Sequence, residues 1–330
     1  MDAILQLPPT LPPHDAAILQ PVAHRTVAEW PEGTFVENLV ARANGDVIVS
    51  VLSEARLDRV SADGAVAVLH QFAAPPTGIA EMDEALYVAM GEPGAGEAVL
   101  WRVDAQSGAA EPWMAIAGSQ FANGVTPFDH QSLLVADSWR GRLLLVDLAA
   151  KSTSVWLEDE RLTRAPGLDF LPGANGVKRY RDTVTISSNG RALLLQADVK
   201  ADGVAGVLSV RAERLRVDDF AFDRDGDLYL TTHIGHTLDR LRPGGERVSL
   251  AGPEQGMAGS TACAFGRTPT DRTALYVSTT GGIITPPGGR LQPAKLVRLE
   301  VGREGWPLDP PARWPSSPPS TPRIGWPGPN

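Results

Sequence analysis

Cysteine is almost absent from this sequence. Its 330 residues contain a single one, Cys263, which excludes an internal disulfide and a metal cluster built from several thiolates. The chain has no run of about 18 consecutive apolar residues, the length that spans a membrane. Residues 1–21 also lack the basic segment and the unbroken apolar run of a signal peptide. We therefore expect a soluble, cytoplasmic protein without a membrane partner.

Basic residues are also fewer than acidic ones. The chain has 30 Lys and Arg residues against 39 Asp and Glu residues, a net charge of −9. Nucleic acids bind to basic surfaces, so we expect no nucleic-acid partner. The patterns G-x-S-x-G, H-E-x-x-H, Walker A and paired C-x-x-C are missing as well. The remaining expectation is a small-molecule substrate, bound by a monomer or weak homodimer.

What the sequence does contain is a repeat. Residues 217–235, VDDFAFDRDGDLYLTTHIG, contain a strand after an acidic pair, a polar turn, a second strand and a loop with a histidine. Similar units recur about every 40–50 residues, a spacing typical of propeller blades. In the first unit, Asn44-Gly45 and Asp63-Gly64 are strong hairpin turns because these residues tolerate positive φ.

The last of the six units is one strand short. Residues 25–30, RTVAEW, look like a strand without a nearby partner. Adding this strand to the last unit closes a ring and protects its edges. We therefore predict an all-β fold, a six-bladed β-propeller closed by the amino-terminal strand. It covers residues 25–305 and is flanked by a proline-rich arm, residues 1–24, and a proline-rich tail, residues 306–330.

A polar residue begins the first strand of every unit, followed by a small or polar residue and then an apolar one. These six residues are Glu37, Thr77, Asn123, Asn175, Asp218 and Thr261. Because the innermost strands of a propeller line its channel, the six side chains are predicted to form a ring. All six offer hard oxygen ligands, which suit Ca²⁺ or Mg²⁺ better than zinc or copper. An open cation could polarise a carbonyl or activate a water.

The same residue types also satisfy backbone groups at turns and strand starts. This structural explanation applies most to Thr77 and Thr261, which we otherwise assign to substrate binding. It applies least to Glu37 and Asp218, because two carboxylates facing one channel repel each other without a cation.

Loops between the second and third strands of each unit are expected at the same end of the channel. They carry Trp139 and His233, which together with Phe121 are our candidates for contact with the substrate. The general base could be Asp218 or His233.

The chain resembles the regucalcin/gluconolactonase family of six-bladed propellers over about residues 25–303, and more distantly diisopropyl fluorophosphatase and strictosidine synthase. The marks are Glu37, Asn175-Gly176-Val177, and Asp218 ahead of FAFDRDGDLYL. The resemblance implies that Glu37, Asn175 and Asp218 bind a divalent cation, usually calcium. It also implies that Asn123 contacts metal-bound water or substrate.

Two positions depart from the sugar lactonases of that family. Asn38-Leu39 follows Glu37 where they usually have Gly-Pro, and Phe121 stands where they tend to have an arginine. The stretches ENLVARANGDVIVS and DDFAFDRDGDLYLTTH are closer to propellers of natural-product gene clusters, some of which resemble hetero-Diels–Alderases.

Three functions follow. The first is a divalent-metal-dependent hydrolase of a lactone or related ester, with Asp218, Asn123 and His233 as catalytic residues. The second is a biosynthetic cyclase that acts on an apolar, reactive intermediate. The third is a non-catalytic binding propeller.

Overall fold

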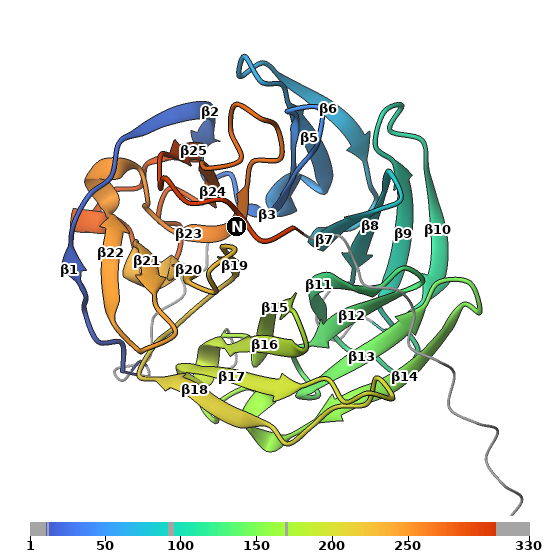
Figure 1. Cartoon of the computed structure of the whole chain (residues 1–330). Coiled ribbons are helices and arrows are strands. Elements are labelled where there is room, and N and C mark those ends of the chain that lie inside the picture. The colour runs from blue at the N-terminus through green and yellow to red at the C-terminus, as the bar shows by residue number, and fades with distance from the viewer. Residues whose placement is uncertain (1–10, 12, 92–95, 169–170, 308–330) are drawn as a thin grey trace, which may run out of the picture.

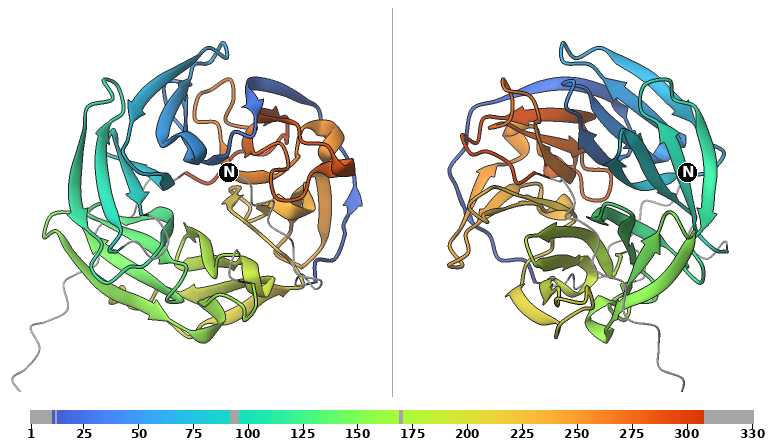
Figure 2. Two further views of the ribbon diagram at one scale, coloured as in Figure 1. Left: turned by 180° about the vertical axis from the view of Figure 1, so that it is seen from behind. Right: turned by 45° about the vertical axis from the view of Figure 1, so that its right-hand side comes forward.

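Six sheets, five of four strands and one of five, surround a central channel in the computed structural model, which describes residues 11, 13–91, 96–168 and 171–307. The sheets are arranged radially, so the predicted six-bladed β-propeller is confirmed (Figure 1). The view from behind and the view turned by 45° show the same closed ring (Figure 2). The predicted tail from residue 308 onward and the first ten residues of the arm lie outside the described residues.

Each blade runs from its innermost strand at the channel to its outermost strand at the rim. In this order the first three blades contain β3 (Val36–Ala41), β4 (Val47–Val51), β5 (Arg56–Val60) and β6 (Val66–Gln71); β7 (Pro76–Met82), β8 (Ala85–Met90), β9 (Val99–Asp104) and β10 (Ala110–Ala115); β11 (Ala122–Asp129), β12 (Ser132–Asp137), β13 (Arg142–Asp147) and β14 (Ser152–Glu158). The other three contain β15 (Ala174–Tyr180), β16 (Thr183–Ser188), β17 (Leu193–Asp198) and β18 (Ser209–Glu213); β19 (Phe220–Phe222), β20 (Leu228–Thr231), β21 (Leu238–Leu241) and β22 (Arg247–Ala251); β23 (Ser260–Phe265), β24 (Leu275–Thr279), β25 (Pro293–Leu299) and β2 (His24–Glu32).

The helices of the described residues are single 3-10 turns. They are η1 (Leu52–Glu54), η2 (Glu160–Leu162), η3 (Asn189–Arg191), η4 (His233–Gly235), η5 (Pro253–Gln255) and η6 (Pro287–Gly289). None of them is long or apolar enough to cross a membrane.

The core lies between adjacent blades, and this explains the strand sequences. A strand near the channel is covered on both faces, so β8, ALYVAM, is buried at every position. A strand at the rim is covered poorly, so β6, VAVLHQ, is largely exposed. The apolar content of the chain is therefore concentrated in the inner strands of each blade.

The amino-terminal strand closes the ring as predicted. Strand β2 pairs antiparallel with β25, with Trp30 opposite Ala294. The indole Nε1 of Trp30 donates to Asp58 Oδ2 on β5 at 2.8 Å, and Arg56 Nε donates to the other oxygen of Asp58 at 2.7 Å. Because β5 belongs to the first blade, the bond from Trp30 joins the last blade to the first, and Arg56 holds the accepting carboxylate in place.

A cycle of six side-chain hydroxyls joins the blades around the channel. Each hydroxyl donates to a backbone carbonyl at the start of the inner strand of the next blade. The donor and acceptor pairs are Ser50 and Thr77, Thr77 and Ala122, Ser138 and Ala174, Ser187 and Asp218, Thr231 and Thr261, and Thr261 and Val36. Each blade is thereby joined to both of its neighbours.

Glycines allow these inner strands to approach each other closely. A Cβ added to Gly78 would lie 1.9 Å from the carbonyl oxygen of Asn123, and one added to Gly124 would lie 2.2 Å from that of Asn175. Asn123-Gly124 and Asn175-Gly176 both lie inside strands, β11 and β15. Their glycines therefore serve strand packing, whereas the Asn-Gly of a hairpin serves a tight turn.

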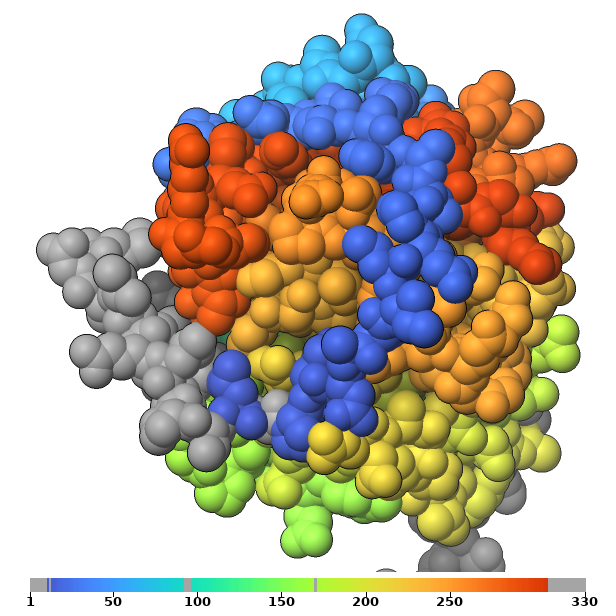
Figure 3. All heavy atoms as spheres, turned by 90° about the vertical axis from the view of Figure 1, so that its left-hand side faces the viewer, coloured from blue at the N-terminus to red at the C-terminus, as the bar shows by residue number. Residues whose placement is uncertain are grey.

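The described part of the arm lies along the rim of the fifth blade. Strand β1 (Ile18–Leu19) pairs parallel with β22 and extends that blade to five strands. The arm crosses this blade as a band before it enters the sixth (Figure 3). Asp15 forms an ion pair with Arg214 at 2.8 Å, and His14 Nδ1 accepts from the backbone N–H of Arg216 at 3.1 Å.

We expect acid to release this arm. Burial, and then the charges of Arg216 and Arg247, lower the pKa of His14 to about 4, whereas Asp15 acts in the opposite direction. A pKa below the unfolded value means that the stabilisation is complete above about pH 6.5 and is lost as the pH falls toward 4. Between pH 7 and pH 5, hydrogen-exchange protection factors of the Gln20 and Val22 amides should fall about tenfold.

The control is His14→Gln, which keeps an acceptor but does not titrate. Its protection factors should stay constant over this pH range. An equal loss in the variant and the wild type would contradict the role of His14.

Candidate functional site

The six ring residues lie at one end of the channel, which we call the start face because the inner strands begin there. The opposite end is the finish face. Asp218 directly precedes β19, and His233 opens the turn η4 after β20. Both segments belong to the fifth blade and return to the start face, so two residues 15 positions apart are brought together.

Asp218 is the centre of the site. The amide Nδ2 of Asn175 donates to its Oδ1, and its Oδ2 lies 2.9 Å from His233 Nδ1. All three side chains are buried. Each oxygen of the Asp218 carboxylate is therefore engaged by a donor from a different side chain, which fixes the carboxylate plane.

His233 is held in a defined orientation. With Nδ1–H directed to Asp218, Nε2 accepts a hydrogen bond when the imidazole is neutral and donates one when it is protonated. Nε2 is buried and has no hydrogen-bond partner among the described residues. The His233 backbone has a φ of 41°, a left-handed value that is costly for a residue other than glycine. The ring also meets Phe35 edge-on, with 5.5 Å between centroids.

Glu37 lies recessed in the channel beside two other carboxylates. Burial raises its pKa well above the usual value, and the negative charges of Asp218 and Asp219 raise it further. Lys178 Nζ forms an ion pair with Asp219 at 2.6 Å. Lys178 thus pairs with one of three clustered carboxyl groups, and the cluster favours either a proton or a cation at Glu37.

The residues that the resemblance assigns to a cation are Glu37, Asn175 and Asp218. In the described ranges, no group of three His, Cys, Asp or Glu side chains is arranged to hold a metal ion. The assigned set contains a carboxamide as its third member, and its oxygens match the chemistry that Ca²⁺ prefers. The carboxylate crowding that raises the Glu37 pKa is also what a cation would relieve.

Three other ring residues have different surroundings. Asn123 is buried on β11, one blade before Asn175. The hydroxyl of Thr77 donates to Ala122 and Ala89, and that of Thr261 donates to Val36 and Ser278. Both threonines thus join backbone segments, and their role in substrate binding stays a prediction.

Phe121 and Trp139 form an aromatic pair in the third blade. Their ring centroids are 6.3 Å apart, and the guanidinium of Arg164 lies 4.3 Å from the centroid of the Trp139 ring. Trp139 lies in the loop after β12 and Phe121 directly before β11, so both belong to the start face. The predicted apolar contacts are therefore placed together, at the same end of the channel as Asp218.

Asn189 is a further polar residue of the loops between second and third strands, which were expected at this end of the channel. It opens η3, as His233 opens η4 in the next blade, and its Oδ1 is buried without a hydrogen-bond partner in the described part of the chain. The two residues therefore occupy corresponding positions in neighbouring blades.

Comparison with known proteins gives two kinds of relative. No protein-family profile matches the chain. A protein from Phoma sp. is 26% identical over 356 aligned positions, which cover 87% of this chain and 92% of the relative. A protein from Sarocladium schorii is 25% identical and covers 80% of each chain. Both are described as putative hetero-Diels–Alderases. In sequence, this chain is similar to proteins of that description.

The similar solved structures are six-bladed propellers of the regucalcin and gluconolactonase kind. Regucalcin from Agrobacterium tumefaciens, described as a calcium-binding protein, has a TM-score of 0.68 and 16% identity, covering 90% of this chain and 99% of its own. A gluconolactonase from Xanthomonas campestris has a TM-score of 0.63 and 15% identity, covering 88% and 94%. This likeness confirms the expected fold. The descriptions of the two sequence relatives support an enzyme.

Proposed function

We propose that the protein is a cyclase that promotes a hetero-Diels–Alder reaction of an apolar, oxygen-containing intermediate at the start face. The observation that carries the proposal is the pair of Asp218 and His233, with Nε2 of the histidine buried and without a protein partner. The descriptions of the two sequence relatives support the same reaction class. We therefore place the cyclase ahead of the lactone hydrolase that the ring residues first suggested.

The reaction needs no covalent bond between the protein and the substrate. A conjugated C=C–C=O unit and an alkene form one C–C and one C–O bond, and no atom or electron is gained or lost. Acceleration then comes from holding the two partners in register and from a hydrogen bond to the reacting oxygen. The orienting surfaces would be Phe121 and Trp139, and the donor would be His233 Nε2–H, steadied by Asp218.

A hydrolase is the second candidate, and the same pair of residues supports it. When neutral, His233 Nε2 could take a proton from a water that attacks a lactone carbonyl, with Asp218 stabilising the imidazolium that forms. The two candidates need different protonation states of one nitrogen. They also differ in their product: cycloaddition leaves the mass of the substrate unchanged, whereas hydrolysis adds one water.

Chiral chromatography coupled to mass spectrometry, after incubation with two probes, distinguishes them. One probe carries an α,β-unsaturated ketone tethered to an alkene, and the other is an aliphatic δ-lactone of similar size. We expect the first to give an isomer enriched in one enantiomer, where the reaction without enzyme gives a racemate. Lactone opening alone would favour the hydrolase, and no turnover of either probe would favour a non-catalytic binding propeller.

We also propose that Glu37, Asn175 and Asp218 hold a Ca²⁺ ion, which when bound would polarise a substrate oxygen. On this proposal, Ca²⁺ at about 100 times its Kd should stabilise the fold by about 2.7 kcal/mol, a rise of several degrees in Tm. Chelation by EGTA should reverse the rise, and Glu37→Gln should abolish it. An unchanged Tm in wild type at millimolar Ca²⁺ would contradict the metal site and leave the roles of Asp218 and His233 in place.

A further inference from the structure

A large cavity among the described residues lies at the finish face, away from the site of Asp218 and His233. Its volume is about 1220 Å³, somewhat above the usual range of small-molecule pockets. Its lining contains residues that follow the ring positions along the inner strands, such as Leu39, Ile79 and Val125. Glu37, Asn175, Asp218 and His233 do not line it. The cavity is therefore distinct from the proposed reaction site.

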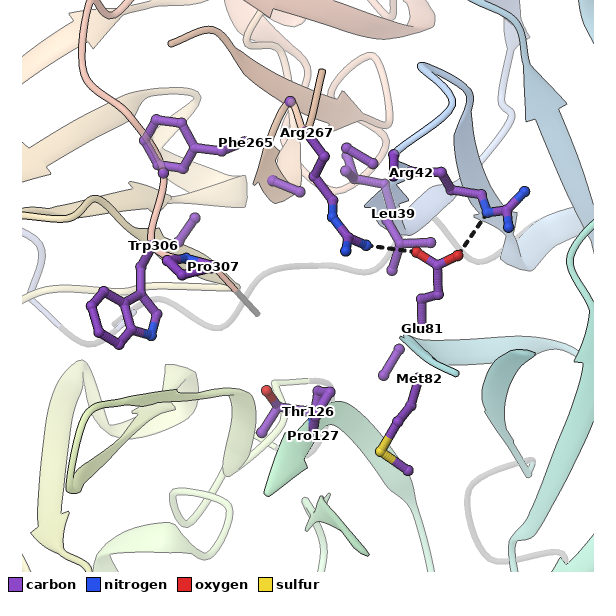
Figure 4. A pocket seen from close by; sticks show the side chains of 18 of the residues that line it. Leu39, Arg42, Glu81, Met82, Thr126, Pro127, Phe265, Arg267, Trp306 and Pro307 are labelled. Atoms are coloured by element: carbon purple, nitrogen blue, oxygen red, sulfur yellow. Dashed lines mark hydrogen bonds and ion pairs between the residues drawn. The ribbon is translucent and has the colours of Figure 1, made fainter. Parts of the chain in front are cut away.

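The polar centre of this cavity is Glu81, held between two guanidinium groups (Figure 4). Arg42 Nε donates to Glu81 Oε1 at 2.8 Å, and Arg267 Nη1 donates to Oε2 at 2.8 Å. The two arginines come from the first and sixth blades, and Glu81 comes from the second. Two positive charges meet one negative charge, so this part of the wall carries one positive charge in excess.

The two arginines are not equally free to bind a ligand. Arg42 also donates to the carbonyl of Ala105 and its side chain is 12% exposed, whereas that of Arg267 is 35% exposed. Glu81 accepts from one of the five N–H donors of the Arg267 guanidinium. The Arg267 guanidinium thus has N–H donors for a second planar anion, while its hydrogen bond to Glu81 holds the guanidinium in place.

Apolar side chains provide the rest of the surface. Met82 and Pro127 lie on one side of the cavity, and Phe265 and Trp306 lie on the other (Figure 4). Trp306 packs against Tyr180, with 4.7 Å between ring centroids, and its backbone N–H donates to the carbonyl of Phe222. A ring system or hydrocarbon chain can lie against this surface with its charged end at Arg267.

We propose that this cavity is a second ligand site, which binds an apolar organic carboxylate with its charged group on Arg267. The negative charge of the carboxylate complements the excess positive charge of the Arg42, Glu81 and Arg267 group. The volume of the cavity accommodates a ligand with two or more fused rings. The site is independent of the reaction proposed for the start face. Its occupant need not be the substrate of that reaction.

Calorimetric titration of the full-length chain with 2-naphthoate tests the proposal. We expect saturable binding, and at least tenfold weaker binding of 2-naphthalenemethanol, which has the same rings but no charge. Arg267→Met should weaken naphthoate binding about tenfold and leave the alcohol unaffected, because a charge-assisted hydrogen bond is lost. Trp306→Ala should weaken both compounds to a similar degree, because it removes apolar contact.

Two variants control for indirect effects. Arg290→Met removes an exposed arginine outside the cavity and should leave naphthoate binding unchanged. Asp218→Asn alters the start face and should also leave it unchanged, which locates the binding at the finish face. If Arg267→Met fails to fold, Arg267→Lys keeps the charge without the planar fork and should show a smaller loss. Wild-type affinity in Arg267→Met, or equal affinity for the acid and the alcohol, would overturn the proposal.

Discussion

Asp218→Asn is expected to lower the turnover of the cyclisation probe by about 10²–10⁴-fold, the range that a positioned proton donor or acceptor contributes. Asn175 Nδ2 and His233 Nδ1 both donate to the Asp218 carboxylate. An asparagine presents one oxygen and one NH₂ group, so in either orientation one donor faces another donor. His233 then loses the contact that fixes its ring and its tautomer.

The matched control for this variant is Asp225→Asn, in the exposed turn between β19 and β20. Asp225 pairs with Arg303 at the surface, and its loss should change turnover less than twofold and stability by about 0.5 kcal/mol or less. Steady-state rates and melting curves of both variants should be measured together. Full turnover by a folded Asp218→Asn protein would remove this residue from the mechanism in both candidate reactions.

Gly124→Ala should be among the most damaging single-methyl changes in the channel wall. The added Cβ would lie 2.2 Å from the carbonyl oxygen of Asn175, a backbone atom that cannot move without displacing β15. We expect a loss of about 3 kcal/mol or more, at the upper end of overpacking effects, with a fall in Tm of about 5–10 °C. Since the clash displaces Asn175 and hence Asp218, turnover should also fall.

Gly244→Ala provides the comparison for that change. No atom lies within 4 Å of a Cβ added there, and its backbone is not left-handed. Its Tm should stay within about 1–2 °C of the wild type. A Gly124→Ala protein with the same Tm would show that the inner strands are less tightly apposed than their glycines indicate.

The fold could be predicted from the sequence because each blade repeats the same local pattern. Hairpin turns such as Asn44-Gly45 mark the strands, and the missing fourth strand of the last unit identifies residues 25–30 as its partner. The same alignment selected Glu37 over Glu32. In the structure Glu37 lies on the innermost strand β3 and Glu32 ends the outermost strand β2.

The contacts at the site were less accessible to prediction. The contact of His233 with Asp218 depends on the left-handed backbone of His233 in η4. A left-handed residue is usually signalled by glycine, and this position has a histidine instead. The hydroxyl cycle was missed because a threonine at a strand start has the same local sequence whether it faces a ligand or a neighbouring blade. Its acceptors, such as Ala122 for Thr77, come from the following blade.

The cavity at the finish face was not anticipated at all. Arg42, Glu81 and Arg267 lie at corresponding ends of three inner strands, but nothing in their local sequence indicates that two arginines share one carboxylate. That arrangement depends on the sizes of the side chains on three blades at once. Long-range packing of this kind can be recognised only in the assembled ring.

The pairing of β2 with β25 also has a consequence for how the protein is made. Trp30 and Ala294 are about 260 residues apart, and closing a loop of that length costs about 5 kcal/mol of chain entropy. Strand β2 is synthesised early but can pair only after β25, the last strand of the described residues, has been made, and its edge stays exposed to other chains until then. A circular permutant that carries residues 13–32 behind residue 305 would make this pairing local, and it should refold faster and aggregate less than the natural order of strands.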